Sequence, residues 1–228
     1  MDIRNRGEKA KVRKKLNMDT TAEQFDQLAR KVFAPVYPVI AEKFLQTSKI
    51  SSGLCLDLGC GSGYLGLAIA ELSNLVVSLV DSNPKMLALA RKNIKDLRLE
   101  KRVSTLLADV HRIPLADCTV QLAVSRGSVF FWQDLPQAFS EIYRVMAPGG
   151  RAFIGGGFGT PELKKQIDEK MLQRQPNWFE HLRENIGPAA PDKYHTAMFQ
   201  AGIADYHIDH SPIELWVVIK KNNSSVVF

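Results

Sequence analysis

The feature that most constrains the fold of this chain is an alternation of short apolar runs with amphipathic stretches after residue 53. The apolar runs are hydrophobic at successive positions, as in parallel strands that helices cover on both faces. The stretches between them have helical spacing. This succession predicts a doubly wound α/β fold. The predicted strands are Leu54–Leu58, Leu75–Val80, Val103–Ala108, Val120–Val124 and Arg151–Ile154, and the predicted helices are Tyr64–Leu72, Pro84–Leu97 and Leu135–Met146.

The last third of the chain follows a different pattern. Pro161–Gln175 and Asp192–Ala201 have helical spacing, whereas Asp205–His210 and Glu214–Lys220 are typical strands joined by a Ser-Pro turn. Two strands joined by so short a turn pair antiparallel. We therefore expect a Rossmann-like, mostly parallel sheet of seven strands that ends in a C-terminal antiparallel hairpin.

The N-terminal region divides into a basic tail and a helical segment. Seven basic residues stand against two acidic ones between Met1 and Lys15, in a chain whose formal net charge is +6. We interpret residues 1–20 as a flexible tail, with steering toward nucleic acid as the alternative. Thr21–Arg30 is a predicted helix, and the prolines at 35 and 38 should break Val32–Leu45. We expect one domain over residues 21–228, with a helical lid at 21–50 and a helical substrate-side segment at 160–200.

The cysteines and histidines indicate a reducing compartment and no metal site. Cys55, Cys60 and Cys118 include no CxxC pair, and two of them fall in or beside a predicted buried strand, which favours reduced thiols in a cytoplasmic protein. No two histidines have the i, i+4 spacing of a helical metal site. No apolar run has the length of a membrane span, so we expect neither a membrane partner nor a metal.

A glycine-rich turn after the first predicted strand indicates a binding site. Asp57 and Leu58 run directly into Gly59-Cys60-Gly61-Ser62-Gly63 and then into a helix. Such glycines let the backbone turn tightly, and the free N–H groups of the helix attract anionic parts of a ligand. The residues from Gly61 to Gly66 also satisfy the dinucleotide fingerprint GxGxxG. An NAD-dependent oxidoreductase is therefore one interpretation of this turn.

Three further features distinguish a second interpretation. Asp57 stands two residues before the first glycine, where dinucleotide binders usually keep the strand apolar. Asp81 and Asp109 follow the second and third strands, where carboxylates can accept hydrogen bonds from ribose hydroxyls and from an adenine amino group. The Ala147-Pro148-Gly149-Gly150 segment is predicted to be a turn before the fifth strand.

These motifs resemble a family. LDLGCGSG at 56–63, VDSNPKML at 80–87, ADVHRIPL at 108–115 and APGG at 147–150 resemble class I S-adenosylmethionine-dependent methyltransferases of the type 11 small-molecule group. FAPVYP at 33–38, SRGSVFFW at 125–132 and GGGFG at 155–159 are similar to a narrower prokaryotic subgroup. The resemblance covers about residues 25 to 220. It implies S-adenosylmethionine as cofactor and S-adenosylhomocysteine as product.

The resemblance also implies roles for individual residues. The glycines of the turn would line the methionine and ribose portion of the cofactor, Asp81 would hold the ribose hydroxyls, and Asp109 would face the adenine edge. Ser125 and Arg126 occupy the place where the fourth strand opens onto the reaction centre. The expected cofactor-binding residues are Tyr37, Asp57, Gly59, Cys60, Gly61, Gly63, Asp81, Ser82, Met86, Asp109, Val110, Ser125 and Arg126.

Three residues are candidates for a catalytic role, although the sequence assigns none. Arg126 follows a buried strand and has two interpretations, a grip on a substrate carboxylate or phosphate and a salt bridge with an acid such as Asp57. Tyr37 would either donate its hydroxyl to the cofactor carboxylate, close over the substrate, or belong to an apolar helix. His111 would be a general base or a hydrogen-bonded surface histidine.

Two other segments are expected near the same edge of the sheet. Gly155-Gly156-Gly157 is predicted to follow the fifth strand with its backbone close to a ligand. In Val129–Trp132 we expect core packing, with one ring that lines the pocket.

We expect a methyltransferase acting on a small molecule, with Pro161–Ile186, including Trp178 and Phe179, closing the acceptor pocket. An RNA or other macromolecule methyltransferase that uses the basic tail is the first alternative, although the chain has no NPPY-like motif for a flipped base. A cofactor-binding protein without methyl transfer is the second. Methyl transfer is an in-line displacement that depends chiefly on positioning, so no strong catalytic dyad is required. The sequence does not indicate an oligomeric state.

Overall fold

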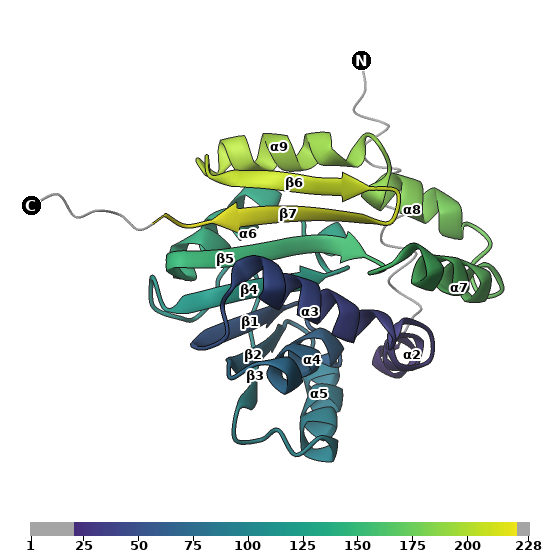
Figure 1. The fold of residues 1–228 in the computed structure, drawn as a ribbon, viewed down its shortest axis with the longest axis horizontal. Helices are drawn as coiled ribbons and strands as arrows, with labels where there is room; N and C mark the ends of the chain where they lie inside the picture. The colour runs from purple at the N-terminus through teal and green to yellow at the C-terminus, as the bar shows by residue number, and fades with distance from the viewer. Residues whose placement is uncertain (1–20, 223–228) are drawn as a thin grey trace, which may run out of the picture.

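A computed structural model of the chain describes residues 21–222, which contain a seven-stranded sheet of order β3-β2-β1-β4-β5-β7-β6 (Figure 1). The first five strands are parallel to one another, and β7 is antiparallel to both β5 and β6. The predicted parallel sheet and terminal hairpin are confirmed. The basic tail predicted over residues 1–20 lies outside the described residues. The strands are β1 (Leu54–Leu58), β2 (Val76–Asp81), β3 (Val103–Leu107), β4 (Val120–Arg126), β5 (Met146–Gly157), β6 (Tyr206–Ser211) and β7 (Glu214–Lys220).

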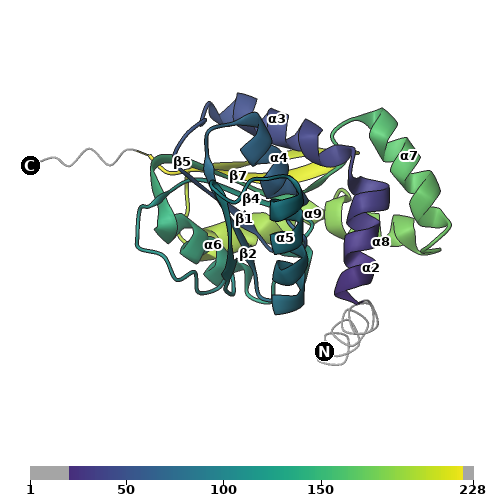
Figure 2. The ribbon, with the colours of Figure 1, turned by 90° about the horizontal axis from the view of Figure 1, so that it is seen from below.

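Helices cover both faces of the sheet. Two of them, α3 and α4, pack on each other over one face, while α6 and α9 pack on each other over the opposite face (Figures 1 and 2). The α-helices are α2 (Ala22–Leu28), α3 (Val36–Ser48), α4 (Tyr64–Leu72), α5 (Pro84–Asp96), α6 (Leu135–Val145), α7 (Pro161–Leu172), α8 (Trp178–Ile186) and α9 (Ala190–Gln200). A π-helical turn, η1 (Ala29–Phe33), and a 3₁₀ turn, η2 (Val129–Phe131), complete the helical elements of the described residues.

The predicted break in the N-terminal helix is present and has a local cause. α2 continues into η1, and α3 then starts with Pro35 as its N-cap residue. Pro38 lies in the first turn of α3, where a missing N–H costs no helical hydrogen bond. The two prolines therefore begin a new helix, and they place Phe33 at the junction.

Strand β5 is longer than the sequence predicts. The segment predicted to be a turn before it, Ala147–Gly150, is a bulge inside it, because Val120 pairs with Met146 and Leu122 pairs with Arg151. The glycine run predicted to follow β5 also belongs to it. Gly155 pairs with Trp216 and Gly157 with Glu214 of β7. Both expectations were wrong, because pairing with β7 continues the strand through residues that favour turns when considered alone.

The carboxyl ends of the parallel strands point toward one end of the molecule. In Figure 1 this is the right-hand end, and α2, α7 and α8 lie beyond it. Phe44 of α3 fastens that helix to the sheet, since its ring stacks on Phe153 of β5 at 4.4 Å and meets Trp216 of β7 edge-on at 4.9 Å. This end of the sheet is the edge where ligands bind in doubly wound folds.

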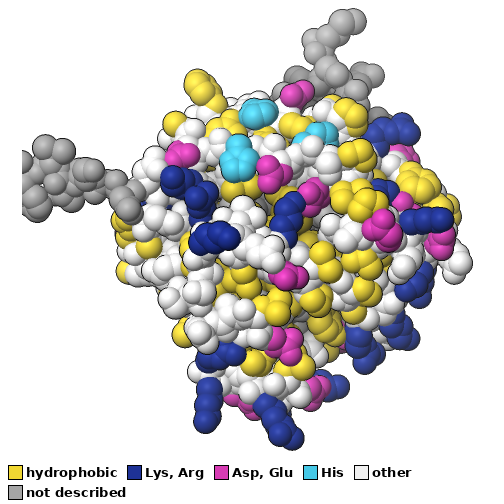
Figure 3. All heavy atoms as spheres, in the orientation of Figure 1, with side chains coloured by type: hydrophobic (Ala, Val, Ile, Leu, Met, Phe, Trp, Pro, Cys, Tyr) yellow, Lys and Arg dark blue, Asp and Glu magenta, His cyan; other side chains and the backbone are white. Residues whose placement is uncertain are grey.

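Charged side chains of both signs are interspersed on the face shown in Figure 3. Among the helices of residues 21–222, none is long and apolar enough to cross a membrane.

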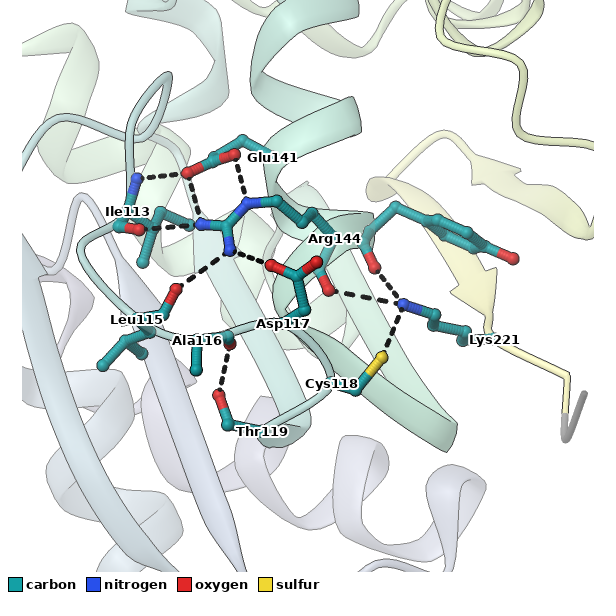
Figure 4. A network of polar contacts seen from close by, with 10 residues as sticks. Ile113, Leu115, Ala116, Asp117, Cys118, Thr119, Glu141, Arg144 and Lys221 are labelled. Carbon is teal, nitrogen blue, oxygen red and sulfur yellow. Dashed lines mark hydrogen bonds and ion pairs between the residues drawn. The ribbon is translucent and has the colours of Figure 1, made fainter.

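A polar network fixes the connection between β3 and β4 to helix α6 (Figure 4). Arg144 of α6 donates to Glu141 and to the carbonyl oxygens of Ile113 and Leu115, and it also pairs with Asp117. The hydrogen bond from Arg144 lowers the pKa of the Glu141 carboxyl. The connection begins next to Asp109, so this network limits the movement of one wall of the site described below.

Candidate functional site

The turn after β1 is built on left-handed glycines. Gly59, Gly61 and Gly63 have φ angles of +63°, +55° and +90°, a region that favours glycine. The Cys60 N–H donates to the carbonyl oxygen of Val80 at 2.9 Å, which fastens the turn to the end of β2. Gly63 is the N-cap residue of α4 and has no capping side chain, so the first N–H groups of α4 point toward this turn.

Asp57 lies beneath the turn and is 2% exposed. Its Oδ2 accepts from the Gly66 N–H at 2.9 Å. A Cβ at Gly66 would lie 2.4 Å from Leu79, so the third glycine of the GxGxxG pattern is needed for close packing of α4. Burial raises the pKa of Asp57 to about 7, against the opposing effect of the Gly66 hydrogen bond. In this position Asp57 supports the turn from below.

Asp81 joins the end of β2 to the same turn. Its Oδ2 accepts from the Gly61 N–H and its Oδ1 accepts from the Asn83 N–H, both at 2.8 Å. Burial raises the pKa of this carboxyl in spite of these bonds. Each oxygen has a further lone pair, so Asp81 can still accept from hydroxyls of a ligand.

Ser128, which the sequence analysis did not single out, joins β4 to the glycine turn. Its Oγ lies 2.6 Å from the Ser125 Oγ and donates to the Leu58 carbonyl oxygen at 2.9 Å. A Cβ at Gly59 would lie 2.3 Å from the Ser128 Cβ. Ser128 belongs to the SRGSVFFW segment, but only the fold brings it against Gly59.

Asp109 and His111 form a local pair at the edge of the site. The Asp109 Oδ1 accepts from the His111 backbone N–H at 2.9 Å and lies 2.5 Å from its ring Nδ1. The backbone hydrogen bond from His111 lowers the pKa of Asp109. The His111 Nε2 accepts from the Asp134 N–H at 3.3 Å. Both ring nitrogens are engaged, which favours the interpretation of His111 as a hydrogen-bonded surface histidine.

Arg126 lies at the end of β4 between two aromatic rings. Its guanidinium carbon is 4.7 Å from the Phe33 ring centroid and 5.4 Å from that of Tyr37, distances typical of cation–π contacts. Its Nε donates to the carbonyl oxygen of Gly157 at 3.0 Å. Burial lowers the pKa of Arg126 and raises that of Tyr37. The expected alternative, a salt bridge with Asp57, is not among the ion pairs of residues 21–222.

These elements surround a cavity of about 870 Å³, a volume in the range of small-molecule sites. Three of the predicted residues, Asp57, Gly63 and Ser125, lie outside its lining and behind the residues that form it. The predicted residues that line the cavity are Tyr37, Gly59, Cys60, Gly61, Asp81, Ser82, Met86, Asp109, Val110, His111 and Arg126.

The other half of the cavity is aromatic and apolar. The predicted segments Pro161–Ile186, Gly155–Gly157 and Val129–Trp132 all contribute to it, although the sequence singled out few of its residues one by one. The predicted Trp178 lines it, whereas Phe179 is half exposed and does not. Of the segment Val129–Trp132, one ring was expected to line the cavity, but the rings of Phe130, Phe131 and Trp132 all line it. The further lining residues include Phe25, Leu28, Phe33, Phe130, Phe131, Trp132, Gly156, Gly157, Phe158, Met171, Gln175, His181, Leu182, Asn185 and Ile186.

Polar groups are sparse in this aromatic half. Trp178 stacks on the His181 ring at 5.9 Å, and burial lowers the pKa of His181. The Asn185 Nδ2 donates to the His181 carbonyl oxygen at 2.9 Å. Within residues 21–222 no group of three or more His, Cys, Asp or Glu side chains is arranged to hold a metal ion. The three cysteines are free thiols.

Comparison with known proteins identifies this architecture. A family model described as a methyltransferase domain matches residues 56–154. A demethylmenaquinone methyltransferase of Lactobacillus johnsonii is 31% identical over 183 residues, which cover 78% of this chain and 75% of that protein. A Methanococcus maripaludis crystal structure, assigned as an S-adenosylmethionine-dependent methyltransferase, shares 38% identity with a TM-score of 0.86 and covers 90% of this chain and 94% of that one. The chain belongs to the class I S-adenosylmethionine-dependent methyltransferases.

The cofactor of this methyltransferase is therefore S-adenosylmethionine, and a dinucleotide is excluded as the explanation of the GxGxxG pattern. The acceptor differs among the relatives. A malonyl-[acyl-carrier protein] O-methyltransferase of Pectobacterium atrosepticum is 34% identical over 120 residues, but the chain spans only 44% of its length. Similarity therefore identifies the reaction class, while the acceptor must be argued from the cavity.

Proposed function

We propose that this methyltransferase transfers the methyl group of S-adenosylmethionine to a small-molecule acceptor held in the aromatic half of the cavity. The observation that carries the proposal is the division of one cavity of about 870 Å³ into two chemically different halves. The glycine turn, Asp81 and Asp109 provide one half. The rings of η1, η2 and α8 provide the other.

The first half fits the cofactor. A Cβ at Gly61 would meet no atom within 4 Å, so this glycine borders open space and not packed protein. We assign the ribose hydroxyls to Asp81, whose lone pairs remain available, and the adenine edge to Asp109 and Val110. Ser82 and Met86 line the same wall. The N–H groups at the start of α4 offer a site for the amino-acid carboxylate.

The chain's own task in the reaction is positioning. The bound cofactor supplies an activated methyl group, whose bond to sulfur breaks with the electron pair left on sulfur while an acceptor lone pair forms the new bond. Holding two reactants in line accounts for a large part of such a rate enhancement. Arg126 and Tyr37 lie where the two halves meet and orient the acceptor. His111 lies at the outer edge, so we assign no proton transfer to it.

The aromatic half favours a small molecule over a nucleic acid. Arg126 is the one lining side chain with a permanent positive charge among the described residues, and phosphate backbones are bound by several Lys and Arg side chains. Rings and aliphatic side chains form most of the remaining wall, with Gln175, His181 and Asn185 among them, as in predominantly apolar sites that hold a few polar groups.

The test is incubation of the full chain with methyl-labelled S-adenosylmethionine and a metabolite extract, followed by separation of small molecules from protein and nucleic acid. We expect label in a low-molecular-mass product. Phe158→Ala removes a wall of the aromatic half and should lower the labelling rate by about tenfold or more, because the acceptor is no longer held in line, with unchanged affinity for S-adenosylhomocysteine. Phe199→Ala, at an 85% exposed position on α9, is the matched control. Label confined to macromolecules contradicts the proposal.

A further inference from the structure

The two halves of the cavity also differ in charge. The carboxylates that line it within the described residues are Asp81 and Asp109, and both follow the strands of the cofactor half. Among residues 21–222, no carboxylate lines the aromatic half. Arg126 is its one permanently charged side chain. An acceptor in this half therefore meets a positive charge and no negative one.

The surroundings of Arg126 leave its charge without a partner of opposite sign. None of the described Asp and Glu side chains lies within 4.0 Å of its guanidinium. Its fixed partners are neutral: the Gly157 carbonyl oxygen and the Phe33 and Tyr37 rings. A cation removed from water is costly unless an anion compensates it. The guanidinium fork matches an anionic oxygen group.

Aromatic surface surrounds this cation. Phe33 meets Trp178 with 6.4 Å between ring centroids, and Phe158 meets Trp178 edge-on at 6.2 Å. The Phe130 ring lies over Gly156, where a Cβ would come within 2.8 Å of it. The missing side chain at Gly156 thus leaves room for a ring next to the backbone that Arg126 contacts. These rings form a wall suited to a flat apolar body.

From this arrangement we infer that the acceptor is an amphipathic anion, a flat apolar body with an oxyanion such as a carboxylate that Arg126 binds. The inference rests on the proposed function and narrows its substrate class. The cofactor also has a carboxylate, which we assign to the Tyr64 and Leu65 N–H groups at the start of α4, since the Gly66 N–H already donates to Asp57. Arg126 contacts Phe33 of η1 and the end of β5, which line the acceptor half, and Tyr37 of α3, which lies where the two halves meet.

The first experiment separates the metabolite extract on a strong anion exchanger at pH 8 and supplies each fraction to the wild-type chain with labelled S-adenosylmethionine. We expect the methyl label in the retained, anionic fraction. Labelling of small molecules only in the unretained fraction overturns the inference and leaves the proposed function standing. Absence of label from small molecules in both fractions overturns the proposed function itself, so the two failures are distinguishable.

The second experiment compares Arg126→Lys and Arg126→Gln, with Arg91→Gln on the exposed face of α5 as control. With the retained fraction, Arg126→Gln should label at least about 100-fold more slowly and Arg126→Lys about tenfold more slowly, because lysine keeps the charge but loses the fork. Affinity for S-adenosylhomocysteine should change by less than about threefold in each variant, since other residues hold the cofactor. The lysine variant preserves the charge of the site and provides the measurement if glutamine impairs folding.

Calorimetry with two cofactor-derived ligands distinguishes the two sources of a carboxylate. S-Adenosylhomocysteine has the amino-acid carboxylate, whereas 5′-methylthioadenosine lacks it. If Arg126→Gln weakens only the first ligand by tenfold or more, Arg126 binds the cofactor and the inference is overturned. Equal affinity of wild type and variant for both ligands, together with slow labelling of the anionic fraction, supports it.

Discussion

At the residue scale, two glycines of the same turn have different reasons to be glycine. Gly59 has a φ of +63°, and its added Cβ would collide with Ser128, while Gly61 has a φ of +55° and borders open cavity. We predict that Gly61→Ala lowers the stability by about 1–2 kcal/mol, through its backbone conformation alone. The same substitution should also weaken cofactor binding, because the new methyl group occupies the site. Gly59→Ala should unfold more easily, since the collision adds to the same backbone cost.

Urea unfolding and calorimetry with S-adenosylhomocysteine measure these two effects separately. A second comparison, Gly59→Ala with Ser128→Gly, should recover part of the lost stability, because the colliding side chain is removed. Equal stability of the two single variants would contradict the assignment of Ser128 as the neighbour that excludes a side chain at Gly59.

A second residue-scale prediction concerns the pH dependence of stability at Asp57. Its pKa is about 7 in the folded chain, whereas an unfolded aspartate titrates near 3.9. The folded state therefore binds this proton more tightly, and the resulting stability is complete below about pH 4 and is lost as pH rises toward 7. Asp57→Asn mimics the protonated carboxyl and keeps an oxygen for the Gly66 N–H. We expect it to be more stable than wild type at pH 8, by roughly 1–4 kcal/mol.

The measurement is the free energy of unfolding of both chains, without cofactor, at pH 5, 6, 7 and 8. The advantage of Asp57→Asn should shrink as the pH falls, because the wild-type carboxyl becomes protonated. Asp96→Asn at the end of α5 serves as a control for the loss of one carboxylate. A difference between Asp57→Asn and wild type that stays constant over this range would show that Asp57 is not the titrating group.

At the element scale, strand β5 depends on glycine where it pairs with β7. A Cβ at Gly155 would lie 1.9 Å from the Leu215 carbonyl oxygen, a backbone atom that cannot move without breaking the pairing. A Cβ at the neighbouring Gly156 would lie 2.8 Å from the Phe130 ring, and this side chain can rotate away. We predict that Gly155→Ala costs about 3 kcal/mol and that Gly156→Ala costs less but lowers methyl transfer by narrowing the acceptor half. Thermal denaturation and labelling rates test this pair, and equal destabilisation would contradict it.

The same strand illustrates what the sequence can and cannot predict. Tyr64–Leu72 is a helix as predicted, because its signals are local: a glycine N-cap residue and regular apolar spacing. The Pro148-Gly149-Gly150 segment has equally clear local signals for a turn, yet it bulges out of β5, because β4 pairs with the residues on both sides of it and the pairing with β7 begins at Arg151. Local preference fails where partners distant in sequence determine the backbone.

At the scale of the whole molecule, the site combines a predictable half with an unpredictable one. Motifs in the sequence locate Gly61, Asp81 and Asp109, because each lies at or just after the end of a parallel strand and such ends meet at one edge. The contact of Phe33 with Trp178 joins residues far apart in the chain, and their spacing does not predict it. The reaction class is thus encoded in short motifs, whereas the proposed acceptor pocket depends on how the N-terminal and middle helices fold over the sheet.

Because the cofactor site is built from several elements of the fold, we predict that S-adenosylhomocysteine, the product formed from the cofactor, stabilises the whole molecule. A ligand that binds only the folded state at a hundredfold excess over its dissociation constant adds about 2.7 kcal/mol to the stability. S-Adenosylhomocysteine should therefore raise the melting temperature, while NAD at the same concentration should not. Asp81→Asn should lose most of this increase, because removing one charged acceptor weakens binding by about 1–3 kcal/mol, whereas Asp96→Asn should retain it. A rise in melting temperature with NAD, or an undiminished rise for Asp81→Asn, would contradict the assignment of Asp81 to the ribose hydroxyls.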